Sequence, residues 1–191
     1  MRRLAVLLAL ASLALALPPV SLEYYVLVLD PSGTALGYGI YTVRFNGIDF
    51  MSSFNWIQNP TYYCSPQACA ALQALLNPPA KFLAFTPTGK YVGPGALGFP
   101  NGIIPCDKYL VQQDGIEYTV CAYKNVIVYE EYFKDVAEQV SLKPTPQALQ
   151  LVPFIVDPAP PAVRAFLTAV MITVSVTAVY VFMKRDEIRV L

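Results

Sequence analysis

The sequence predicts a mainly β fold: an antiparallel, sandwich-like extracytoplasmic domain with two short helices, followed by one C-terminal transmembrane helix. Three observations predict it. Short apolar and aromatic segments alternate with turn residues, four cysteines lie in the central part of the chain, and an uncharged apolar run lies near each end. Of the 191 residues, 55% are hydrophobic and only 14% are charged. Typical soluble domains have about 25% charged residues, so this composition favours a chain that lies partly in lipid.

The N-terminus has the order of a secretory signal. Arg2 and Arg3 precede an apolar run over residues 4–17, which contains Ala14-Leu15-Ala16 near its end. This order predicts export, with residues 1–16 removed as a signal peptide. The alternative is an uncleaved anchor helix, but the run is shorter than the roughly 20 residues that a membrane span needs.

Residues 17–143 are predicted to form the β-rich domain. In its clearest hairpin, Asn46-Gly47 has the composition of a two-residue turn, which would place Arg44 opposite Asp49 and Phe45 opposite Ile48. Opposite charges would then meet on one face and apolar groups on the other. The predicted strands cover residues 23–29, 39–45, 48–54, 81–85, 109–111, 116–123 and 126–129.

Two helices are expected within the domain. Ser65 can cap a helix that has Pro66 at its first position and continues to Leu76. A second helix is predicted over about 130–140, where apolar residues recur every three or four positions. Glu130 and Glu131 would then belong to its solvated face.

Four cysteines in an exported domain predict two disulfides. Cys64 and Cys69 lie at the positions that a hydrophobic staple brings together at a helix start, so we expect them to pair. We also expect Cys106 to pair with Cys121, because the two lie directly opposite each other if residues 112–115 form a four-residue loop, whereas a two-residue Asp-Gly turn would leave them on a diagonal. The alternatives are a redox role for Cys64 and Cys69, or thiolate ligation of a metal.

A long loop is predicted over residues 93–105. It contains the spacing G-x-G-x-x-G, but prolines follow where a nucleotide-binding motif requires a helix. Loops of this length without secondary structure are often binding elements. The candidate binding residues are Gly93, Pro94, Gly95, Phe99 and Asn101.

The C-terminal part is predicted to anchor the domain. Residues 144–164 are rich in proline and predict a semi-rigid stalk, whose apolar patch over 149–156 leaves open that part of it packs on the domain as an edge strand. The uncharged run over 165–183 is just long enough to span a bilayer, and the basic residues of the tail, 184–191, place the C-terminus in the cytoplasm. Within this run, Ala169, Thr173 and Thr177 form a small-residue stripe that favours close approach of another helix.

The composition excludes several classes of function. The chain has no histidine, which excludes Ser-His-Asp and Cys-His nucleophiles and histidine-ligated metals. The equal numbers of basic and acidic residues, 13 of each, argue against a nucleic-acid partner, and no motif indicates a cofactor or a catalytic carboxylate pair.

The sequence therefore predicts a non-catalytic surface protein of a plasma membrane or viral envelope, in contact with lipid and with other proteins. One alternative is an accessory subunit of a respiratory or transport complex in a membrane. Another is a membrane-tethered thiol oxidoreductase that uses Cys64 and Cys69.

Overall fold

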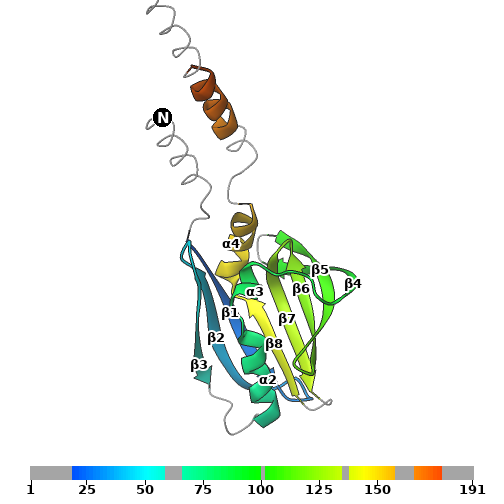
Figure 1. Cartoon of the computed structure of the whole chain (residues 1–191). Coiled ribbons are helices and arrows are strands. Elements are labelled where there is room, and N and C mark those ends of the chain that lie inside the picture. The colour runs from blue at the N-terminus through cyan, green and yellow to red at the C-terminus, as the bar shows by residue number, and fades with distance from the viewer. Residues whose placement is uncertain (1–18, 59–65, 100–101, 135–137, 158–165, 178–191) are drawn as a thin grey trace, which may run out of the picture. The chain divides into compact units, whose positions relative to one another are not determined.

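The computed structural model describes residues 19–58, 66–99, 102–134, 138–157 and 166–177. The chain divides into two units, Met1–Val156 and Asp157–Leu191. The described part of the first unit holds eight strands and three helices (Figure 1). In chain order they are β1 (Val20–Leu29), β2 (Ala35–Phe45), β3 (Phe50–Gln58), α2 (Pro66–Leu76), α3 (Ala80–Leu83), β4 (Lys90–Phe99), β5 (Gly102–Gln113), β6 (Ile116–Tyr123), β7 (Val126–Lys134), β8 (Glu138–Pro144) and α4 (Pro146–Val156).

The strands form one antiparallel sheet in the order β3-β2-β1-β8-β7-β6-β5-β4. Two runs of consecutive hairpins, β1 to β3 and β4 to β8, are joined by the pairing of β1 with β8. The mainly β, antiparallel prediction is confirmed, but the predicted sandwich is replaced by a single sheet. Alternation along the strands reveals an apolar face, yet it does not reveal whether helices or a second sheet will cover that face.

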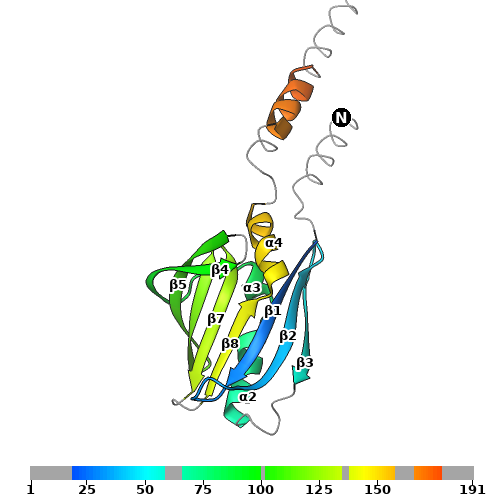
Figure 2. The ribbon, with the colours of Figure 1, turned by 180° about the vertical axis from the view of Figure 1, so that it is seen from behind.

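Helices cover the apolar face of the sheet. Alternate residues of β1, from Leu22 to Val28, are buried in a core that they share with α2, Phe82 of α3 and the inner side of α4. Figures 1 and 2 show α2 and α3 on one side of the sheet, with the strands passing behind them in one view and in front of them in the other. The 11-residue helix α2 has the bounds that its capping sequence predicts.

The predicted helix over 130–140 is wrong. The structure has β7 and β8 there, paired from Glu130 opposite Leu142 to Lys134 opposite Glu138. The apolar spacing in this segment fits a strand as well as a helix, and its β-branched and aromatic residues favour the strand once β6 and β8 are available as neighbours. The two adjacent glutamates consequently lie on opposite faces of the sheet.

Residues 81–85 are also not a strand, because most of them belong to the short helix α3. Two prolines precede this helix, and proline is well suited to a helix start because its φ is fixed near the helical value. Phe85 follows the helix and donates its backbone N–H to the carbonyl of Asn125, at an N···O distance of 2.7 Å.

Two hairpin turns differ from their predicted lengths. Phe45 pairs with Phe50, so residues 46–49 form a four-residue loop, in which Oδ1 of Asn46 accepts the N–H groups of Ile48 and Asp49. The predicted pairing of Arg44 with Asp49 is therefore wrong, and Met51 lies opposite Arg44. The β5–β6 turn is shorter than the predicted four-residue loop. It is the two-residue turn Asp114-Gly115, whose φ angles of 53° and 77° match the primed turns that twisted hairpins favour.

Two segments predicted to be irregular have regular structure. Most of the predicted loop over 93–105 belongs to the β4–β5 hairpin, which pairs Pro94 with Asp107 and Phe99 with Gly102. Much of the predicted stalk is α4, which buries Ala148, Leu149 and Val152. Proline-rich composition indicated an extended spacer, but Thr145 is buried at the helix start, where its Oγ1 accepts the N–H of Ala148, and the apolar side of the helix gains burial on the sheet.

In the second unit, residues 166–177 are helical. Within the described parts of the chain, no helix has the length and apolar character needed to cross a membrane. The remainder of the predicted span, 165 and 178–183, the tail and the predicted signal peptide lie outside the described residues.

Candidate functional site

A charged pair lies inside the folded unit. Lys81 of α3 places its Nζ 2.7 Å from Oε1 of Glu130 in β7, and the Glu130 side chain is fully buried. The Lys81 side chain keeps 12% of its surface exposed. Charged side chains are almost never fully buried without a partner, so this pair fixes how α3 docks on the sheet.

Aromatic rings enclose the pair. Nζ of Lys81 lies 4.9 Å from the ring centre of Tyr118 and 5.1 Å from that of Phe82, both within cation–π distance. Phe82 also packs with its ring centre 5.1 Å from the rings of Tyr24 and Tyr41. The positive charge therefore meets a carboxylate and two ring faces, in surroundings from which water is largely excluded.

The buried tyrosines use their hydroxyls to hold the backbone. Tyr24 donates to the carbonyl of Ile127 at 2.6 Å, and Tyr41 donates to the carbonyl of Leu76, at the end of α2, at 2.7 Å. Burial raises the pKa of Tyr24, and burial raises that of Tyr41 to about 12. Both hydroxyls are therefore protonated hydrogen-bond donors at neutral pH, with the role of structural anchors.

Burial raises the pKa of the Glu130 carboxyl to about 7, although the ammonium of Lys81 opposes this shift. The second carboxylate oxygen, Oε2, has no hydrogen-bond partner among the residues that the structure describes. The site can thus exchange one proton near neutral pH. Sequence reasoning placed Glu130 on a solvated helix face and missed this site, because only the strand assignment turns the side chain inward.

An apolar pocket of about 330 Å³ lies at one end of the sheet. The pocket is partly open to solvent, and Lys124 and Asn125 contribute polar groups to its lining. Most of its lining is apolar and comes from the start of β1, the end of β2, the start of β3 and the ends of α3 and α4: Val20, Phe45, Phe50, Leu83, Ile155 and Val156. The residues at which the described sheet unit begins and ends therefore meet at this pocket.

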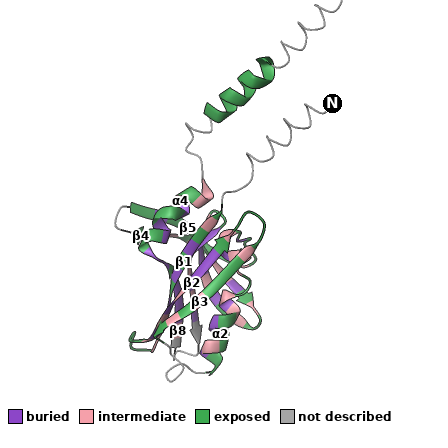
Figure 3. Ribbon diagram, turned by 90° about the vertical axis from the view of Figure 1, so that its left-hand side faces the viewer, coloured by how far each residue is buried: buried purple, intermediate pink, exposed green. Residues whose placement is uncertain are grey.

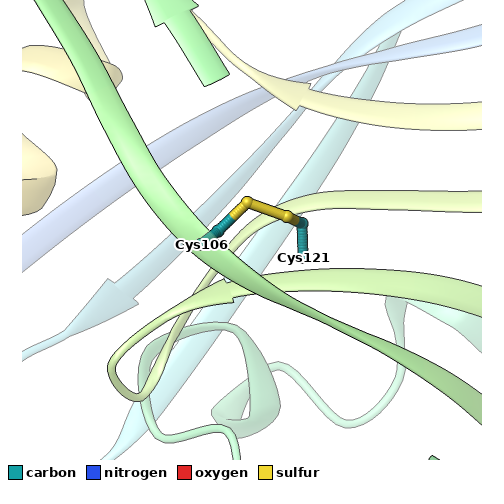
Figure 4. Close-up of a disulfide and its surroundings, with 2 residues drawn as sticks. All are labelled: Cys106 and Cys121. Atoms are coloured by element: carbon teal, nitrogen blue, oxygen red, sulfur yellow. A yellow bond between two sulfur atoms is a disulfide. The ribbon is translucent and has the colours of Figure 1, made fainter. Parts of the chain in front are cut away.

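The Cys106–Cys121 disulfide is confirmed, with the Cα atoms 5.5 Å apart (Figure 4). Cys121 lies opposite Lys108, so the two cysteines occupy diagonal positions, and the four-residue loop used to predict their pairing is wrong. Cys69 is also disulfide-bonded, while its predicted partner Cys64 lies outside the described residues.

The candidate binding residues lie on or beside an edge strand. Gly93, Pro94, Gly95 and Phe99 belong to β4, and Asn101 lies outside the described residues. Gly95 lies opposite Cys106, and a Cβ atom there would come within 2.6 Å of Lys108 Cε and 3.1 Å of Cys121 Sγ. Close packing against the disulfide therefore accounts for this glycine without a ligand.

The small residues of the C-terminal helix bond within that helix. Oγ1 of Thr173 donates to the carbonyl of Ala169 at 2.8 Å, and Oγ1 of Thr177 donates to that of Thr173 at 2.7 Å. Such bonds satisfy hydroxyl groups that face an apolar environment. Elsewhere in the described chain, no cluster of three carboxylates or thiols is placed to hold a metal ion.

No protein-family model matches the chain, and a search of curated proteins finds no significant match.

Proposed function

We propose that the chain is a non-catalytic, membrane-anchored surface or envelope protein, and that its exported, disulfide-stabilised sheet unit mediates binding or assembly. Residues 1–16 act as the export signal, and residues 165–183 cross the membrane as a single helix. The sheet unit lies outside, and residues 184–191 form a short cytoplasmic tail.

The observation that carries the proposal is the meeting of β1 and α4 at one pocket. Val20 and Val156 both line it, so the predicted signal and the predicted span join the same end of the sheet unit. A unit attached at one end presents the rest of its surface to partners. The Cys106–Cys121 disulfide gives independent support for export, because disulfides persist in oxidising compartments.

Membrane extraction of the full chain tests the anchor. The chain, with an epitope after Leu191, is expressed in a host with an export pathway, and its membranes are washed with alkaline carbonate. We expect the chain to stay with the membranes, to begin at Leu17, and to lose its sheet unit to protease added outside intact cells. Release by carbonate, or protection from external protease, would overturn the proposal.

A matched pair of variants makes the test specific to residues 165–183. Val174 lies at the centre of this run, where an arginine costs about 2.5–3.5 kcal/mol of insertion free energy. Val174→Arg should therefore shift the chain into the carbonate-soluble fraction, and Val174→Leu should leave it in the membrane. Purification in mild detergent then separates the surface protein from an accessory subunit, since only the latter should co-purify with a fixed set of multi-span proteins.

A further inference from the structure

β3 is an edge of the sheet. The strand order places β2 on one side of β3, and none of the described strands lies on its other side. Figure 3 shows this strand facing the viewer with much of its length exposed. An edge strand presents backbone N–H and C=O groups that can pair with a strand from another chain.

The two edges of the sheet differ in how they are protected. β4, at the far edge, begins with Lys90, contains Pro94, which has no N–H, and has a register irregularity between Tyr91 and Gly93. Charge, proline and bulges are the devices by which proteins block pairing at sheet edges. β3, at the other edge, has fewer of these devices.

β3 lacks charge, proline and glycine over its whole length. It pairs with β2 without interruption from Phe50 to Trp56, and the register shifts only beyond Trp56. These seven residues thus form an uncharged, regularly paired segment centred on Ser53. The irregularity beyond it limits the length over which another strand can pair.

This segment is self-complementary when a second copy runs antiparallel to it about Ser53. Phe50 then lies opposite Trp56 of the second copy, which gives an aromatic pair at each end on the half-buried face. Met51 lies opposite Asn55 of the second copy on the exposed face. Ser53 faces its own equivalent at the two-fold axis, as an isologous interface requires.

We infer that β3 pairs antiparallel with β3 of a second copy of this chain, with Ser53 at the two-fold axis, and joins two eight-stranded sheets into one. The inference rests on the assembly role proposed above and names the partner. No charged residue of either segment opposes another, so pairing carries no penalty of like charge.

The pairing is compatible with attachment of both copies to one membrane. Antiparallel pairing places Phe50, and the pocket that it lines, at opposite ends of the two segments. Seven residues of strand cover roughly 20 Å. Residues 157–164, which precede the predicted span, can reach about 28 Å when extended, so the chain length allows both copies to enter the same bilayer.

A cysteine at the two-fold axis tests the register directly. Ser53→Cys, a nearly isosteric change at an exposed position, should convert the full chain in mild detergent to a covalent dimer on mild oxidation, because the two thiols face each other. Asn55→Cys is the matched control: it is exposed on the same face, but the two thiols would be about 13 Å apart and should not cross-link. Equal cross-linking of the two variants, or none with Ser53→Cys, would overturn the inference.

A charge exchange at the same position tests the association without a covalent bond. Copies with Ser53→Lys, and separately copies with Ser53→Glu, should each show a dimer dissociation constant raised roughly fivefold or more over that of the wild type, measured by mass in detergent. An equal mixture of the two should recover the dimer. Failure of the mixture to recover it, a monomeric wild type, or open-ended assembly through β3 and β4 would each overturn β3 pairing.

The dimerisation experiments do not test the membrane anchor. Carbonate extraction and protease access test the anchor separately. A chain that is anchored and exported yet monomeric would retain the proposed location and lose the self-assembly. A chain that dimerises through Ser53 yet is released by carbonate would retain the self-assembly and lose the proposed membrane anchor.

Discussion

The Nζ atom of Lys81 lies 2.7 Å from Oε1 of Glu130 and joins α3 to β7 across 49 positions of the chain. The Glu130 side chain is fully buried, and its second oxygen has no partner among the described residues. Burial of a charged carboxyl group is unfavourable, so the stability of the sheet unit should depend on the protonation of Glu130.

The free energy of unfolding should fall as the pH rises from about 4.5 to about 7. Burial raises the pKa of Glu130 from 4.5 to about 7, so the folded chain binds more protons than the unfolded chain within this interval. The stabilising effect of the bound proton is fully present below the unfolded pKa and is lost as the pH passes the folded pKa, a change of about 3 kcal/mol. Urea unfolding at several pH values measures it.

Glu130→Gln should remove most of this pH dependence, because the amide does not titrate. Glu131→Gln, at the adjacent position on the other face of β7, is the control and should keep the slope. Equal slopes for Glu130→Gln and the wild type would show that another group is responsible.

Lys81→Met should destabilise the sheet unit by roughly 3 kcal/mol at pH 8, because it leaves a buried carboxylate without its counter-charge. At pH 5 the loss should be smaller, since Glu130 is then protonated. Lys90→Met, at the exposed start of β4, should change stability by less than about 0.5 kcal/mol. Chemical denaturation at the two pH values distinguishes this result from a loss of packing, which would be the same at both.

Tyr24→Phe should cost roughly 1–3 kcal/mol, because the carbonyl of Ile127 loses the buried hydroxyl that donates to it at 2.6 Å. The neighbouring Tyr25 has 39% of its surface exposed, and Tyr25→Phe should be nearly neutral. Both variants remove one hydroxyl group, so the difference between their urea midpoints measures the effect of the Tyr24–Ile127 hydrogen bond. Equal midpoints would contradict a stabilising role for this bond.

Replacement of both Cys106 and Cys121 by alanine should lower stability by about 3 kcal/mol. The disulfide closes a loop of 15 positions, and the chain-entropy model gives this amount for a loop of that length. The comparison is made by urea unfolding under non-reducing conditions. An unchanged midpoint would mean that this disulfide does not constrain the unfolded chain.

The helix α4 should prove to be part of the folded unit. Val152 is fully buried, whereas the adjacent Leu151 keeps 47% of its surface exposed. Val152→Ala should cost about 2 kcal/mol, and Leu151→Ala should cost less than about 0.5 kcal/mol. Thermal unfolding of the two variants measures the difference, and equal transitions would indicate that this segment is a spacer outside the core.

Local chemistry was sufficient to predict several features. Capping residues defined α2 from Pro66 to Leu76, and alternation with turn residues located β1, β2 and β6. The Cys106–Cys121 pair was also predicted correctly, although the four-residue loop on which that prediction rested is a two-residue turn.

The sequence by itself thus determined the β class, the antiparallel hairpins, the central disulfide and the position of the helix that begins at Pro66, since each depends on residues that are close along the chain. Only the tertiary structure decided that the strands form one sheet, that residues 126–144 form a hairpin, and that Glu130 points inward to meet Lys81. The same apolar spacing can bury one face of a helix or of a strand, and neighbours distant in sequence determine which burial is available. The buried charge of Glu130 follows from that choice.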